Sequence, residues 1–172
     1  MKKLNNVLGL ITLIVIIVLS MAACGDDSES DFDPGNSNHI DNNTLTWTVV
    51  TDSKFGSNSI NSVAYGNGRW VAVGWDGRMS YSDNGKDWTK VENSNFGVDN
   101  ILGISYGNGR WVAVGNYGKI AYSDDNGETW IMATNFGNIN FQSVAYGNGR
   151  WVAGGYGSYN DKIAYSDDNG ET

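Results

Sequence analysis

Short runs of alternating apolar and polar residues fill positions 44–172, and the runs recur about every forty residues. In the middle repeat, Ile101–Tyr106 is rich in β-branched and aromatic residues and is followed by Asn108-Gly109. An Asn-Gly pair between two such runs predicts a tight hairpin, because both turn residues must tolerate positive φ. Arg110–Val114 then alternates again, with Trp111 and Val112 on opposite faces. Because apolar residues do not recur at a period of 3.6, the pattern predicts strands and not helices.

Each repeat is expected to hold four short strands. In the middle repeat, the third strand is predicted at Lys119–Ser123 and the fourth at Glu128–Ala133. Four antiparallel strands in about 40–45 residues is the spacing of a β-propeller blade. The predicted fold class is therefore all-β, a β-propeller of four-stranded antiparallel blades. The repeats occupy about 44–91, 92–133 and 134–172.

One segment occurs three times with little change, at Ser62–Gly74, Ile104–Gly115 and Ser143–Gly155. A side chain that recurs in every repeat usually holds each repeat together, whereas catalysis normally occurs once in a fold. The arginines of this segment are therefore interpreted as hairpin-turn residues: Arg69, Arg110 and Arg150.

The third turn of each repeat carries a second motif. Ser123–Trp130 matches the Asp-box pattern Ser-x-Asp-x-Gly-x-Thr-Trp in full, Ser82–Trp88 is one residue short with Asp87 in place of Thr, and Ser166–Thr172 stops before its Trp. Residues 44–172 resemble the BNR repeats of sialidase-like propellers and of related bacterial proteins, including photosystem assembly factors. The structural Asp-box residues that this resemblance implies are Ser82, Asp83, Gly85, Trp88, Ser123, Asp125, Gly127, Trp130, Ser166, Asp168 and Gly170.

The Asp box has a structural explanation that needs no metal. A short Asp side chain accepts hydrogen bonds from nearby backbone N–H groups, Gly supplies positive φ, and the Trp can cover the seam between blades. Calcium binding is the alternative, but the turn lacks the twelve-residue spacing and terminal Glu of an EF-hand loop. No metal and no cofactor are predicted.

The first 23 residues have the pattern of a secretory signal peptide, with Lys2 and Lys3 before an uncharged apolar stretch. The segment Met21–Cys24 resembles a bacterial lipobox, which implies cleavage before Cys24 and lipid attachment to it. An ordinary signal peptide that happens to contain Cys is the alternative. The resemblance implies an exported lipoprotein of the cell envelope, anchored on the periplasmic face or the cell surface; which membrane stays open.

Residues 24–43 are expected to form an acidic, disordered tether, because Gly25–Asn43 holds six acids and no Lys or Arg. The single histidine, His39, lies here, which excludes a His-based triad or a His-rich zinc site from the repeats. The chain has 19 acids and 11 bases, a net charge of −8, so nucleic acid is not an expected partner.

A ligand is expected at the rim opposite the Asp boxes, where aromatic residues are followed by a cation. Aromatic surfaces with nearby amide and hydroxyl groups suit sugars or extended polar ligands. The alternative is that these aromatics pack blade against blade. The candidate ligand-rim residues are Trp75, Arg78, Tyr117, Lys119, Tyr156, Tyr159 and Lys162.

The repeats are out of register with whole blades. Leu45–Val50 matches the outer strands of later repeats but lacks the three strands that should precede it, and the last repeat lacks its fourth strand. Three blades fall below the usual four to eight. Either the chain is a piece of a longer propeller, which an end inside an Asp box favours, or two or more copies form one ring.

The favoured function is a non-enzymatic binding or assembly module at the envelope, with a glycan or an envelope protein as ligand. The alternative is a sialidase-like glycoside hydrolase or a fragment of one. That family uses an arginine triad, a Tyr–Glu pair and an Asp acid, and its Arg-Ile-Pro-type segment is absent. No acid pair for the two-carboxylate mechanism stands out from the repeats either, so no catalytic residue is assigned.

Overall fold

The structure is a computed structural model that describes residues 46–158 and 160–171. The predicted signal peptide (1–23), Cys24, the tether (24–43) and the rim residue Tyr159 lie outside the described residues. Within the described ranges, no helix combines the length and the apolar character that a membrane span requires. Residues 47–172 cluster as one compact unit, which is the unit described below.

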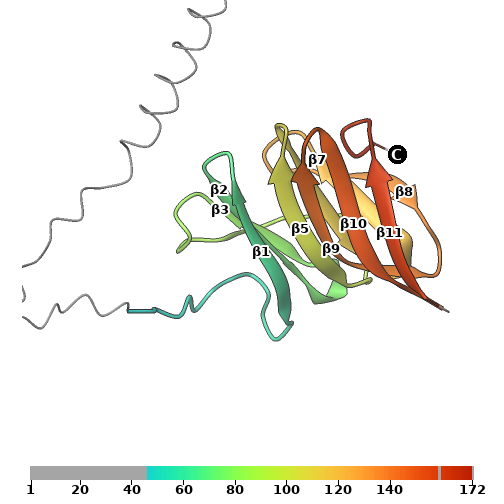
Figure 1. The fold of residues 1–172 in the computed structure, drawn as a ribbon. Coiled ribbons are helices and arrows are strands. Elements are labelled where there is room, and N and C mark those ends of the chain that lie inside the picture. The colour runs from blue at the N-terminus through green and yellow to red at the C-terminus, as the bar shows by residue number, and fades with distance from the viewer. Residues whose placement is uncertain (1–45, 159, 172) are drawn as a thin grey trace, which may run out of the picture. The chain divides into compact units, whose positions relative to one another are not determined.

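The described residues form three antiparallel sheets, which are numbered blades 1 to 3 in chain order (Figure 1). Blade 1 contains β1 (Ile60–Gly66), β2 (Arg69–Gly74), β3 (Met79–Ser82) and β4 (Thr89–Lys90). Blade 2 contains β5 (Ile101–Gly107), β6 (Arg110–Gly115), β7 (Lys119–Ser123) and β8 (Ile131–Asn135). Blade 3 contains β9 (Ile139–Gly147), β10 (Arg150–Gly157) and β11 (Asp161–Ser166). The predicted all-β fold, with three strands in the last repeat, is confirmed.

The first hairpin of each blade turns at its Asn-Gly pair, as predicted. Asn67 and Gly68 have φ of 48° and 76°, and the pairs at 108–109 and 148–149 have the same signs. Two consecutive residues with positive φ form the type I′ turn, whose twist matches that of the flanking strands. The second connection is a single 3-10 turn in blades 1 and 2, η1 (Trp75–Gly77) and η2 (Asn116–Gly118).

Blade 2 is buried on both faces, because it lies between the other two blades. Trp111 and Ala113 belong to the core shared with blade 1, whereas Val112 and Val114 belong to the core shared with blade 3. This separation is the predicted alternation along one strand, and each apolar face is covered by a different neighbour.

The blades meet most closely along β1, β5 and β9, which lie side by side in Figure 1. A Cβ atom on Gly66 would lie 2.2 Å from Cγ of Tyr106, and one on Gly107 would lie 2.3 Å from Cβ of Tyr146. β1 and β5 thus each present a glycine to the tyrosine of the next blade. We call this contact the tyrosine–glycine contact.

Two predicted outer strands differ from the structure. In blade 2 the strand begins at Ile131 and not at Glu128, because Glu128 and Thr129 donate their N–H groups to Asp125 inside the turn. Residues 46–50, the described part of the predicted outer strand Leu45–Val50, form no strand.

The three repeated tryptophans are not equally buried. Trp111 and Trp151 are 0% and 2% exposed, whereas Trp70 is 38% exposed. The difference arises because a preceding blade covers Trp111 and Trp151, whereas no described blade precedes blade 1.

Candidate functional site

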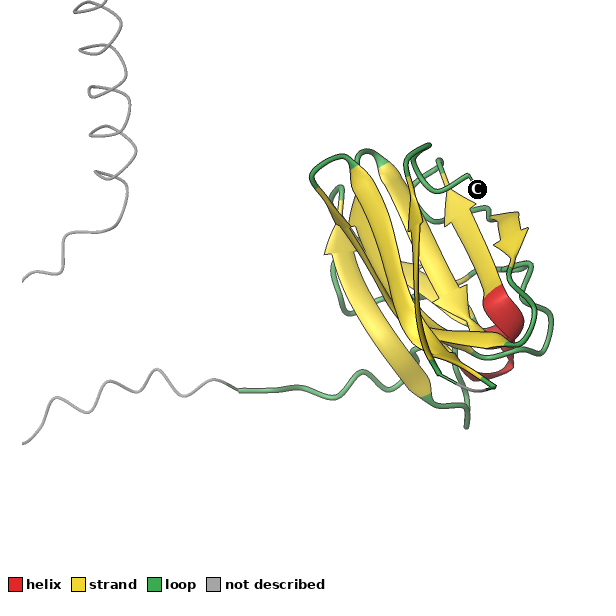
Figure 2. Cartoon of the chain, turned by 45° about the vertical axis from the view of Figure 1, so that its right-hand side comes forward, coloured by secondary structure: helices red, strands yellow, loops and turns green. Residues whose placement is uncertain are grey.

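The two ends of the blades carry different sets of connections. One end holds the Asn-Gly hairpins and the Asp boxes, as the hydrogen bond from Asn126 to the Asn67 carbonyl shows. The opposite end holds η1, η2 and the crossovers between blades; the single-turn helices are red in Figure 2. Gly77 and Gly97 also approach each other there. We call the first end the Asp-box end and the second the ligand rim.

The Asp box of blade 2 directs its hydrogen bonds inward. The Ser123 hydroxyl donates to Asp125 Oδ1 over 2.8 Å and accepts from the Gly127 N–H over 2.9 Å. Asp125 Oδ1 also accepts the N–H of Thr129 at 2.8 Å. Trp130 donates to the Gly127 carbonyl and packs, 3% exposed, in the core between blades 1 and 2. The box therefore closes a turn and seals an interblade seam.

The carboxylate of Asp125 is stabilised within this turn. Partial burial raises its pKa, but hydrogen bonds from the Thr129 hydroxyl and N–H and from Ser123 outweigh burial and hold the pKa below its usual value. In blade 1, Asn84 takes the same place and accepts the N–H groups of Lys86 and Asp87, each at 2.9 Å. An amide side chain suffices there, so the turn does not require a carboxylate at this position.

Across 46–158 and 160–171, no three side chains of His, Cys, Asp or Glu come together in an arrangement that could hold a metal ion.

Two of the arginines beside the hairpins, Arg69 and Arg110, also bind acids of the next blade, which the sequence did not predict. Arg69 binds Asp83 of its own blade through Nε at 2.6 Å, and its Nη1 reaches Glu128 of blade 2 at 3.0 Å. Arg110 repeats the arrangement with Asp124 at 2.6 Å and with Glu171 of blade 3 at 3.3 Å.

These arginines are interblade clamps. Arg110 also donates to the Asn169 carbonyl of blade 3 at 2.9 Å, and its guanidinium lies 4.1 Å from the ring centre of Tyr122. The sequence carried a signal for the pairing within a blade, since Asp83 and Asp124 each follow their arginine by 14 residues. The partner in the next blade could be found only from the fold.

At the ligand rim, one of the cations that were predicted to face a ligand, Lys119, is bound instead to groups of the protein. Lys119 Nζ donates to the Phe96 carbonyl at 2.9 Å and pairs with Asp99 at 2.7 Å, so it holds the crossover between blades 1 and 2. Arg78 is half-buried, and Lys162 is exposed on β11. The crossover residue Phe96 is fully buried.

The three described rim aromatics, Trp75, Tyr117 and Tyr156, are all exposed, but they are not equivalent. Tyr117 corresponds to Asp76 and not to Trp75, because Tyr117 and Asp76 are the central residues of η2 and η1, with φ of 57° and 54°. Each donates its N–H to an Asn side chain where the next blade begins, Tyr117 to Asn140 in β9 and Asp76 to Asn100 just before β5. The aromatics therefore do not follow the strict recurrence that packing between blades would require.

Tyr117 is an unusual residue for its backbone conformation. Positive φ is uncommon for a bulky side chain and costs on the order of 1 kcal/mol. Such outliers concentrate at binding sites, where the surrounding structure holds them in place.

Tyr117 and Tyr156 share a cavity of about 240 Å³, which Asn138, Asn140, Gly157 and Ser158 complete. A second rim cavity of about 380 Å³ lies along Asp76–Arg78 and Lys90–Ser94. Trp75 lines neither. The structure thus brings together two of the predicted rim aromatics with two amide side chains, whereas Trp75 and Lys162 do not line this cavity.

No family model and no curated protein matches the chain. A solved structure described as "YCF48 bound to D1 peptide" matches it with a TM-score of 0.55 and 16% sequence identity, over 67% of this chain and 38% of that chain. The sheets of this protein are β-propeller blades. At this identity the likeness shows the fold alone, and the chain spans well under half of the neighbour's length.

Proposed function

We propose that the protein is a lipid-anchored binding or assembly module of the bacterial envelope, and that it holds an extended segment of a partner protein at the ligand rim. The observation that carries the proposal is the cavity of Tyr117 and Tyr156, with the amides of Asn138 and Asn140 beside them. Two exposed aromatic rings supply contact area at low entropic cost, and amides can pair with the backbone of an extended peptide.

Two further observations support a peptide ligand. The structural neighbour was solved with a peptide bound. The chain also carries a net charge of −8, which disfavours polyanionic ligands. Anchoring through Cys24 rests on the lipobox resemblance.

None of the described contacts favours the sialidase-like alternative. A carboxylate-binding triad needs arginines that face a substrate, whereas Arg69 and Arg110 each hold two acids of the blades.

The proposal is tested by probing arrays of envelope-protein peptides and of glycans with the purified protein. Tyr117→Ala and Tyr156→Ala should each weaken peptide capture about tenfold or more, since aromatic anchors dominate such interfaces. Trp75→Ala is the matched control, an exposed rim aromatic outside the cavity, and it should bind as the unmodified chain does.

Peptide capture that both tyrosine variants retain in full would refute the assignment of this cavity. Binding to the glycan array alone would replace the peptide with a sugar, and turnover of a sialoside would favour the hydrolase.

A further inference from the structure

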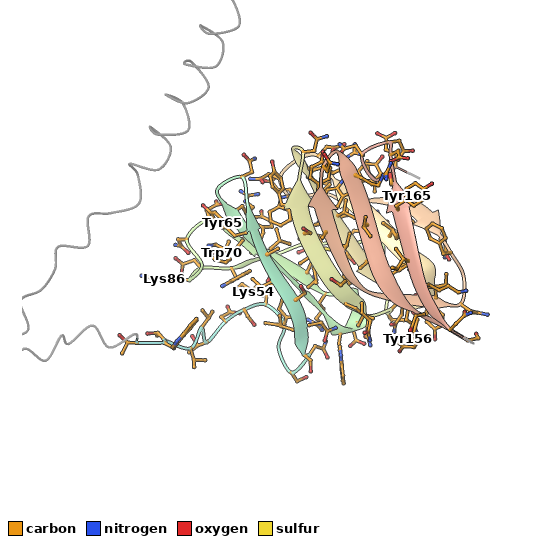
Figure 3. All side chains as sticks on the ribbon, viewed as in Figure 1. Lys54, Tyr65, Trp70, Lys86, Tyr156 and Tyr165 are labelled. Carbon is orange, nitrogen blue, oxygen red and sulfur yellow. The ribbon has the colours of Figure 1, made fainter. Side chains whose placement is uncertain are left out.

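The cavity that Tyr117 and Tyr156 share has no charged side chain in its lining. The residues that line it are Tyr117, Asn138, Asn140, Tyr156, Gly157 and Ser158. The two tyrosines are 56% and 47% exposed, and Figure 3 shows Tyr156 at the end of the sheets opposite Tyr165. Phosphorylated and acidic motifs are bound by clusters of arginine. The neutral lining therefore favours an uncharged segment as the occupant.

The side-chain amide of Asn140 has a fixed orientation. Its Oδ1 accepts the N–H of Tyr117 at 3.1 Å. A backbone N–H can only donate, so the oxygen of the amide must face it and the Nδ2 group is the end that remains. Within the described ranges, no group accepts a hydrogen bond from this Nδ2. The cavity therefore offers an N–H donor in a set direction, and the group that fits it is an acceptor such as a backbone carbonyl.

Blade 1 repeats this amide bond without the cavity. Asn100 holds the place of Asn140, and its Oδ1 accepts the N–H of Asp76 at 3.2 Å. Asn100 lines neither of the two rim cavities, and Asp76 stands where Tyr117 has its ring. The bond to the turn is thus a recurring structural feature, whereas a donor beside two exposed rings occurs at Asn140.

The backbone around the cavity leaves little for an added strand to pair with. Strand addition depends on main-chain hydrogen bonds along a sheet edge. The N–H of Tyr117 is engaged by Asn140, and the N–H of Gly157 donates to the Asn160 carbonyl at 3.0 Å. Tyr156 lies in β10, which is paired on both sides by β9 and β11. Side chains must therefore supply most of the contacts to a ligand.

A segment in the polyproline II conformation matches these features. It is extended and has no internal hydrogen bonds, so its carbonyls are free to accept. Proline has no N–H and therefore requires no acceptor from the cavity. Proline-rich segments dock on exposed aromatic side chains and lose little conformational entropy, because they are already extended when free.

We propose that the segment held at the ligand rim is proline-rich and binds as a polyproline II helix. Its prolines pack against the rings of Tyr117 and Tyr156, and one of its backbone carbonyls accepts a hydrogen bond from Asn140 Nδ2. This inference rests on the proposed peptide-binding function and narrows the partner to one class of segment.

The test is fluorescence anisotropy of a labelled polyproline peptide with the purified full chain in detergent micelles. A labelled Gly-Ser peptide of the same length is the comparison, since it is uncharged but flexible. The unmodified chain should bind polyproline at least about tenfold more tightly than the Gly-Ser peptide. Tyr117→Ala and Tyr156→Ala should each weaken polyproline binding about tenfold or more.

Asn140→Asp isolates the donor. A carboxylate still accepts the N–H of Tyr117, but it presents an acceptor and no N–H to the cavity. Polyproline binding should therefore weaken about tenfold. Asn100→Asp is the matched control, because it adds the same charge at the equivalent bond outside the cavity, and it should bind as the unmodified chain does. The urea midpoints of the two variants should agree, which separates lost binding from lost folding.

Polyproline binding that Asn140→Asp retains in full, or that Asn100→Asp weakens equally, would overturn the role of Asn140. Equal binding of the Gly-Ser peptide would overturn the polyproline II assignment. If the peptide array yields proline-free segments whose capture needs Tyr117 and Tyr156, while polyproline does not bind, the proposed function stands and this inference fails. If neither polyproline nor any array peptide binds, both fail.

Discussion

Replacing Gly107 with Ala should break the closest contact between blades 2 and 3. The new methyl carbon would lie 2.3 Å from Cβ of Tyr146, about 1.1 Å short of ordinary van der Waals contact. Its nearest neighbours are Cβ and Cγ at the base of that side chain. A change of rotamer moves Cγ but cannot move Cβ, whose position the backbone sets, so β5 and β9 must separate.

The expected loss follows from this geometry. Overpacking that forces a backbone shift costs about 1–3 kcal/mol, and occasionally more. The lower chain entropy of Ala in the unfolded state offsets up to about 1 kcal/mol. We therefore expect the free energy of unfolding to fall by about 1–2 kcal/mol, and the midpoint of thermal unfolding to fall by roughly 4 °C per kcal/mol for a domain of this size.

The assay is urea unfolding followed by tryptophan fluorescence, which reports on the buried Trp111 and Trp151. Gly157→Ala is the control, since its Cβ makes only ordinary contacts, and its unfolding midpoint should match or slightly exceed that of the unmodified chain. If Gly107→Ala proves as stable as Gly157→Ala, the close approach of β5 and β9 described above is wrong.

Three further predictions follow from the site. Arg110→Gln removes an interblade clamp and should lower the free energy of unfolding by about 1–3 kcal/mol. Arg150 is half-exposed and pairs with an acid of its own blade, so Arg150→Gln should lower the free energy of unfolding by less than about 1 kcal/mol. Chemical denaturation of the two variants measures the difference. The pKa of Asp125 is lower in the folded protein than its ordinary value of 3.8, so its contribution to stability is present above pH 3.8 and is lost as the pH falls further. Between pH 5 and pH 3, the free energy of unfolding should therefore fall less in Asp125→Asn than in the unmodified chain. An equal fall in both would contradict the assignment. Cys24→Ser should move the protein from the membrane to the soluble fraction on cell fractionation, because a diacylated anchor gives stable attachment, and soluble secretion of the unmodified chain would contradict lipidation.

The blades could be predicted from the sequence because their determinants are local. Asn-Gly pairs such as Asn67-Gly68 set the hairpins, and alternation along Arg110–Val114 separates two apolar faces. The Asp box closes within a few residues, so its pattern predicts a turn whatever the rest of the chain does. The outer strands were the weakest part of the prediction, since Glu128 and Thr129 are drawn into the turn.

The contacts between blades were decided only by the tertiary structure, because they join residues about forty to sixty positions apart. The sequence places Asp83 fourteen residues after Arg69 in the same repeat, but only the stacking of blades brings Glu128 to Arg69. The same holds for the ligand rim. Trp75 and Tyr117 look alike in sequence, yet backbone position places Tyr117 over a cavity with Tyr156 and leaves Trp75 outside it. Local pattern determines a blade, whereas the packing of one blade on the next determines which of its repeated side chains are structural and which remain exposed for a ligand.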